Sequence, residues 1–168
     1  MKKSMFIAVS ALIGLFLACV SSLAMAEAAN PVQMANEVGF VGCDSAISDA
    51  FEHAMKSGER KFNINYFPES QRESIDFSVT FGKPNDTIFQ TIHFEKRGGY
   101  CYAIKRGMIS DLGNCSGLLG KDEYFKYDDD AGGALWAKNK GGVTKLFIQS
   151  GNSCNLIFLS STKSKASR

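Results

Sequence analysis

Polar and apolar residues alternate strictly in Ser74-Ile75-Asp76-Phe77-Ser78-Val79-Thr80-Phe81. Successive side chains of a β-strand point to opposite faces, so the four apolar residues of this stretch share one face. Burying them contributes about 6–12 kcal/mol in transfer free energy. The pattern therefore predicts a half-buried strand with Phe77 in the core and Ser78 on the opposite face.

Short β-rich runs lie on both sides of this strand, separated by turn-forming residues. These runs are 62–66, 87–96, 100–104, 134–137, 143–149 and 154–159. With 74–81 they make about seven strands at short spacing, which is typical of an antiparallel sheet. The segment 106–133 lacks such a pattern, and we expect a long connection there. No internal repeat is visible in the sequence.

One amphipathic helix is predicted from Asp44 to Ser57. Apolar residues recur there with the spacing of a single helix face, and Gly58 supplies the usual stop. These apolar residues are Ile47, Ala50, Phe51, Ala54 and Met55. The fold class is therefore α+β, with one amphipathic helix packed on an antiparallel sheet of about seven strands.

Residues 1–26 have the features of a bacterial secretory signal peptide. Lys2 and Lys3 precede an apolar run from Met5 to Val20, and Ala24 and Ala26 provide the small residues before the cleavage point. The apolar run is short for a membrane span, which needs about 20 residues. We expect cleavage after position 26 and a periplasmic or secreted protein with no membrane span.

An alternative is a lipid anchor on Cys19, because Phe16-Leu17-Ala18 before it resembles a lipoprotein signal. Such signals usually carry leucine where Phe16 stands, so plain cleavage is the preferred interpretation. Cleavage leaves 142 of the 168 residues, enough for one domain. We assign 27–160 to a single exported domain and 161–168 to a basic flexible tail.

Four cysteines remain in the exported chain, and they are Cys43, Cys101, Cys115 and Cys154. An even number in an oxidising compartment predicts two disulfides, with three possible connectivities. A bond between Cys101 and Cys115 would close the long connection, and Cys43 would then pair with Cys154. We prefer this pairing. Zinc is the competing interpretation, but the spacings contain no Cys-x-x-Cys pair.

The sequence argues against several function classes. Removal of the signal leaves 17 basic and 17 acidic residues, whereas a nucleic-acid binder carries a basic surplus. No motif of a serine hydrolase, zinc protease or phosphate-binding loop occurs, and His53 and His93 are expected at the surface. Asp128 begins a calcium-loop-like run, but Asn139 stands where an EF-hand needs glutamate. This run is compatible with a calcium site of looser geometry or with a solvated acidic turn, and the turn is the preferred interpretation. We expect no enzymatic activity, cofactor or metal.

One segment stands out because aromatic and acidic residues adjoin without strand or helix periodicity. It contains Tyr124, Phe125, Tyr127, Asp128, Asp129 and Asp130. Aromatic anchors beside charged groups are typical of protein recognition surfaces, and the carboxylates would steer a basic partner. The competing interpretation is that these rings fold back onto the sheet.

Two functions fit these observations. The first is a small exported, non-catalytic binding protein of inhibitor, immunity or envelope-accessory type, acting on an unidentified protein partner. The second is a periplasmic carrier that holds a small apolar ligand between helix and sheet. Its cavity would be lined by Phe62, Phe77, Phe81, Phe89 and Phe94.

Overall fold

The computed structural model describes residues 30–167, and this part of the chain contains three helices and eight strands. The helices are α1 (Pro31–Glu37), α2 (Asp44–Lys56) and α3 (Cys115–Lys121). The strands are β1 (Glu59–Asn65), β2 (Ser74–Lys83), β3 (Asp86–Arg97), β4 (Tyr100–Leu112), β5 (Lys126–Ala131), β6 (Ala134–Lys138), β7 (Thr144–Ser150) and β8 (Ser153–Lys165). The predicted α+β class is confirmed, with more helices and one more strand than expected. The predicted signal peptide and Cys19 lie outside the described residues.

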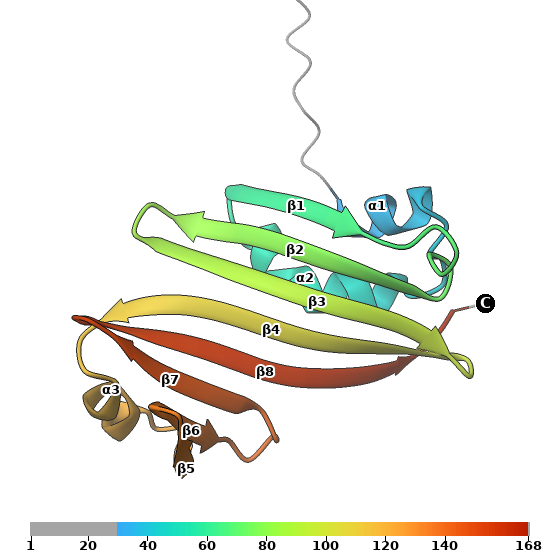
Figure 1. Ribbon diagram of the computed structural model, residues 1–168. Coiled ribbons are helices and arrows are strands. Elements are labelled where there is room, and N and C mark those ends of the chain that lie inside the picture. Colours follow the sequence, from blue (N-terminus) through green and yellow to red (C-terminus); the bar gives the residue numbers. More distant parts are fainter. Residues whose placement is uncertain (1–29, 168) are drawn as a thin grey trace, which may run out of the picture.

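All eight strands form one antiparallel sheet in the order β1-β2-β3-β4-β8-β7-β6-β5. Figure 1 shows β4 and β8 side by side in its middle, with β1 and β5 at the two edges. Neighbouring strands follow each other directly in sequence everywhere except between β4 and β8, with two to five residues in each connection apart from the eight between β1 and β2. The central pair is therefore the one contact in the sheet that joins strands distant in sequence.

The β2 strand has the face assignment that its alternation predicts. Ile75, Phe77, Val79 and Phe81 are buried, and the residues between them lie on the other face. The turn into β3 contains Pro84 and Asn85, and Asn85 has a φ of 68°. A type II turn requires a positive φ at its third residue and commonly has proline at its second. This turn fixes the β2–β3 register.

The first hydrophobic core lies between α2 and strands β1–β4. Phe51 of α2 packs edge-on against Phe62 and Phe77, with 5.2 Å between ring centroids in both pairs. Phe94 lies 6.1 Å from Phe77, also perpendicular to it. Aromatic pairs favour this edge-to-face arrangement. The predicted helix at 44–57 and its apolar face are thus confirmed.

The second core is smaller and lies between α3 and strands β6–β8. Its buried residues are Cys115, Phe125, Ala137, Phe147, Cys154 and Leu156. The expectation of an unstructured connection over 106–133 is wrong, because β4 continues to Leu112 and both α3 and β5 follow. Asn114 caps α3 by accepting hydrogen bonds from the N–H groups of Ser116 and Gly117.

The disulfides join Cys43 to Cys101 and Cys115 to Cys154. The preferred pairing of Cys101 with Cys115 is wrong, because the residues between them form an extended strand and not a loop. At about 3.3 Å per residue, β4 carries the chain more than about 30 Å away from Cys101. Each observed bond closes a long loop and stabilises the fold by about 4 kcal/mol on the chain-entropy account.

The two disulfides reveal an internal structural repeat that the sequence does not show. Cys43 precedes α2 directly and bonds to the second residue of β4, while Cys115 begins α3 and bonds to the second residue of β8. Each half of the fold therefore contains a disulfide-linked helix and four strands, and the first half has α1 in addition. The fourth strands of the two halves pair antiparallel at the centre, which is the arrangement that a twofold axis through β4 and β8 produces.

The C-terminal segment also differs from expectation. Residues 161–165 belong to β8 and pair with the first five residues of β4, so this segment is not a flexible tail. Beyond β8, the Ala166 N–H donates to the Gly99 carbonyl and the Ser167 N–H donates to the Gly42 carbonyl. Residues 161–165 are polar and have no apolar face to bury. Their pairing with β4, which is distant in sequence, holds them in the sheet.

Candidate protein-binding surface

The three helices lie on one face of the sheet. Cys101 and Asp111 are ten residues apart on β4, so they share a face, and Asp111 is the cross-strand neighbour of Cys154. Both disulfides, and the helices they hold, are therefore on that face. Figure 1 shows α1 and α2 along the β1–β4 half and α3 beside β7. We call the opposite side of the sheet the open face.

Five apolar side chains lie next to one another across the open face. Phe89 of β3 faces Met108 of β4, which faces Ile157 of β8. Ile157 faces Leu146 of β7, which faces Trp136 of β6. We call these five residues the apolar row. At about 4.8 Å between strands, the row extends for about 19 Å across the sheet.

The apolar row is accessible to solvent. Phe89 and Met108 are each 41% exposed, and the other three members are partly exposed. One-sided antiparallel sheets normally carry polar residues on the solvent face. A contiguous apolar strip on a solvent-exposed face is typical of a surface that binds another molecule. Ile104 of β4 is 47% exposed and adds to this apolar surface. It lies two residues from Arg106 on the same strand.

The predicted segment Tyr124–Asp130 meets the apolar row at the edge of the sheet. Asp129 of β5 is the cross-strand neighbour of Trp136, the last member of the row. Tyr124 and Tyr127 are 79% and 58% exposed. Asp128 forms an ion pair with Lys138, with 2.7 Å between the carboxylate oxygen and the ammonium nitrogen.

Phe125 has a different environment from its neighbours. It is only 9% exposed, and its ring centroid lies 6.3 Å from that of Phe158 in the second core. Thus one of the three predicted aromatic anchors folds back onto the sheet, while two remain exposed. A surface hollow of about 490 Å³ lies beside Tyr124 and the turn between β6 and β7.

A buried lysine fixes the segment before β5. The Lys145 ammonium group lies 4.0 Å from the Phe125 ring centroid and 4.8 Å from that of Phe158. It donates a hydrogen bond to Asp122 at 2.5 Å, and both side chains are largely buried. The other Asp122 oxygen accepts hydrogen bonds from the N–H groups of Tyr124 and Phe125.

The environment of Asp122 lowers its pKa. Burial by itself raises the pKa, but the hydrogen bonds from Lys145 and from the backbone outweigh it and favour the carboxylate. This pair was not predicted from the sequence. The available signal was that Lys145 and Phe147 are two residues apart on one strand and hence share a face.

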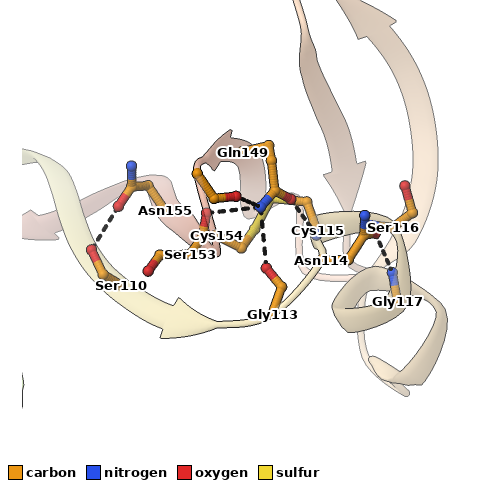
Figure 2. The surroundings of a disulfide bond; sticks show 11 residues. Ser110, Gly113, Asn114, Cys115, Ser116, Gly117, Gln149, Ser153, Cys154 and Asn155 are labelled. Atoms are coloured by element: carbon orange, nitrogen blue, oxygen red, sulfur yellow. Dashed lines mark hydrogen bonds between the residues drawn. A yellow bond between two sulfur atoms is a disulfide. The ribbon is translucent and has the colours of Figure 1, made fainter.

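The Gln149 side chain both accepts and donates hydrogen bonds beside the Cys115–Cys154 disulfide, as Figure 2 shows. The Gln149 side-chain oxygen accepts a hydrogen bond from the Cys115 N–H at 2.9 Å. Its amide nitrogen donates to the Gly151 carbonyl at 2.8 Å and lies within hydrogen-bonding distance of the carbonyls of Gly113 and Ser153. The disulfide and this amide together fix the start of α3 to the β7–β8 hairpin.

The phenylalanines expected to line a ligand cavity do not share one space. Phe62, Phe77, Phe81 and Phe94 are buried beneath α2, where their rings belong to the first core. Phe89 lies on the open face, because it differs from Phe94 by an odd number of positions along β3. The carrier hypothesis therefore loses one of its five lining residues.

The histidines and acidic residues occupy separate positions. His53 is exposed on α2, and His93 of β3 lies 3.0 Å from Asp76. Within residues 30–167, no three His, Cys, Asp or Glu side chains converge as metal ligands would. In the same range, none of the helices has the length and apolar character needed to cross a membrane.

Comparison with known proteins gives no assignment. No family model, no curated protein and no solved structure matches this chain.

Proposed function

We propose that this chain is a small exported, non-catalytic binding protein of inhibitor, immunity or envelope-accessory type, whose open face binds a protein partner. The observation that carries this proposal is the apolar row, which spans five strands on the side of the sheet away from the helices. The row and its polar surroundings have the layout of an interface, with an apolar centre and a polar rim.

The build of the fold supports the same proposal. Two disulfides and a continuous sheet hold the open face in one shape, and a preorganised surface loses little conformational entropy on binding. Disulfides of this kind form in oxidising compartments, in line with the predicted export. In this proposal Asp129 extends the open face to the edge of the sheet. The exposed Tyr124 and Tyr127 add contacts around that edge, where Tyr127 is the cross-strand neighbour of Ala137 on the helix side.

The test is site-specific photo-crosslinking in the periplasm followed by a binding measurement. A photoreactive residue at Met108 should crosslink one protein, whereas the same residue at Ser48 on the exposed side of α2 should not. With that protein purified, Met108→Asp should weaken binding by about tenfold or more, and the matched control Ser48→Asp should leave it unchanged. Equal crosslinking at both positions, or unchanged affinity of Met108→Asp, would contradict the proposal.

A further inference from the structure

We propose that the partner presents an acidic surface around the apolar element that contacts the open face. This inference rests on the proposed function and adds the charge of the partner. It reverses the expectation drawn from the acidic segment alone, which pointed to a basic partner. The evidence is the distribution of charge over the open face.

The central strands of the open face carry only positive charge. Arg106 of β4 and Lys163 and Lys165 of β8 point to this side, because they alternate with the residues that face the helices. No aspartate or glutamate lies on this side of β4 or β8; Asp111, the only acidic residue of the pair, is on the helix side. The middle of the open face is therefore cationic.

These cations lie beside exposed aromatic rings. The Lys163 ammonium group is 3.9 Å from the ring centroid of Tyr100 and 5.5 Å from that of Tyr102. Arg97, which also contacts Glu95, lies 5.5 Å from the Tyr102 ring. Aromatic faces attract cations, so the rings hold Lys163 at the surface without neutralising it. The Lys163 charge stays available to an incoming group.

The carboxylates of the open face lie away from its two central strands, and several are already paired. Among the described residues, Asp128 is paired with Lys138 at 2.7 Å, and Glu95 lies 3.6 Å from Arg97. Glu59 and Asp129 form no ion pair within residues 30–167, but they lie on the edge strands β1 and β5. Asp76 is bonded to His93. By contrast, Arg106, Lys163 and Lys165 form no ion pair within residues 30–167. The uncompensated charge at the centre is positive, and an acidic partner complements it.

The apolar row indicates that the occupant is a protein and not a nucleic acid. Arg106 lies two residues from Met108 on the same face of β4, so cations and apolar groups form one continuous surface. Three members of the row are aliphatic or thioether side chains, whereas single-stranded nucleic acids bind to stacked aromatic rings. A protein surface with an apolar centre and acidic surroundings complements both the apolar row and the cations beside it.

The experiment uses a random copolymer of glutamate and tyrosine as a defined acidic probe and a lysine–tyrosine copolymer as its counterpart. Methyl groups of Met108, Ile157 and Leu146 report binding at the row by NMR, and those of Met34 and Met55 report on the helix side. The acidic copolymer should shift the first set alone. Its affinity should fall about tenfold between 50 and 300 mM salt, because screening weakens attraction between exposed charges.

Two pairs of substitutions test the assigned residues. Arg106→Gln with Lys163→Gln should weaken binding of the acidic copolymer by about tenfold. The control pair Lys56→Gln with Lys121→Gln, on the helices, should leave it unchanged. All four positions are on the surface, and circular dichroism verifies that the variants fold.

Three results would overturn the inference: no shift at the row with the acidic copolymer at 50 mM salt, equal or tighter binding of the lysine copolymer, or tighter binding of oligo(dT) at the same methyl groups. Each is distinct from failure of the proposed function. If the lysine copolymer binds the row, the open face remains a binding surface and only the charge of its partner is wrong. If Met108 crosslinks no more than Ser48 in the periplasm, the proposed function itself fails.

Discussion

Replacing Lys145 with methionine should destabilise the protein more than any other single change to a charged residue of the second core. The substitution keeps the length of the side chain but removes the ammonium group that lies 2.5 Å from Asp122. It leaves a carboxylate that is largely buried and has only two backbone N–H partners. Breaking a buried ion pair by removing one partner costs about 3–5 kcal/mol.

That cost is large against a total stability of about 5–15 kcal/mol for a domain of this kind. Because the methionine gains packing against Phe125, Phe147 and Phe158, we expect the lower end, about 3 kcal/mol. The measurement is urea unfolding at pH 7, compared with Asp122→Asn and with the double variant. Asp122→Asn keeps an oxygen acceptor for the backbone, so the double variant should recover part of the loss.

The pH dependence gives a second readout. The folded pKa of Asp122 is below its unfolded value, so the stabilising effect of this carboxylate is present above about pH 4 and is lost as the pH falls through the folded pKa. The stability difference between wild type and Lys145→Met should therefore shrink below about pH 4. A Lys145→Met protein within about 0.5 kcal/mol of wild type at pH 7 would refute the argument, as would a difference that grows in acid.

Three further predictions concern the core, the disulfides and the edge segment. Phe77→Asp places an unpaired carboxylate in the first core and should cost more than about 4 kcal/mol, whereas Ser78→Asp should be mild; similar melting temperatures would contradict the face assignment. Changing Cys115 and Cys154 together to serine should cost about 4 kcal/mol, and peptide mapping without reduction should recover this pair in the wild type; a peptide linking either cysteine elsewhere would disprove the topology. Tyr127→Ala should weaken partner binding by about 1–3 kcal/mol with little change in melting temperature, because the ring is largely exposed; a lowered melting temperature with normal binding by the folded fraction would count against it.

The sequence predicted those elements whose signal is local. The alternation around Phe77 and the helical spacing around Phe51 each show one buried face, and both residues are in the core as expected. The same reasoning would have placed Phe89 on the opposite face from Phe94, since strand faces follow position alone. Grouping the phenylalanines by residue type concealed the apolar row.

The failures have a common cause in the pairing of β4 with β8. The second half of β4 and the end of β8 are rich in polar residues, so neither shows the alternation that predicts a strand. Each pairs with the opposite half of the other strand, 106–112 with 153–159 and 161–165 with 100–104. These partners are separated by 40 or more residues of sequence, so local patterns do not reveal the pairing. The wrong disulfide pairing followed directly, because it treated the chain between Cys101 and Cys115 as a flexible loop.

The position of the apolar row explains why the smaller half of the fold needs so many fixed contacts. Phe89 and Met108 belong to the half built on α2, whereas Ile157, Leu146 and Trp136 belong to the half built on α3. The second half has a helix of seven residues and a small core, which by themselves resist local opening weakly. The Cys115–Cys154 bond, the Gln149 amide and the Lys145–Asp122 pair all act on β7 and β8, the strands that carry Leu146 and Ile157, from the helix side. A row shared between the halves binds as one surface only while the second half stays in register, and these contacts keep it there.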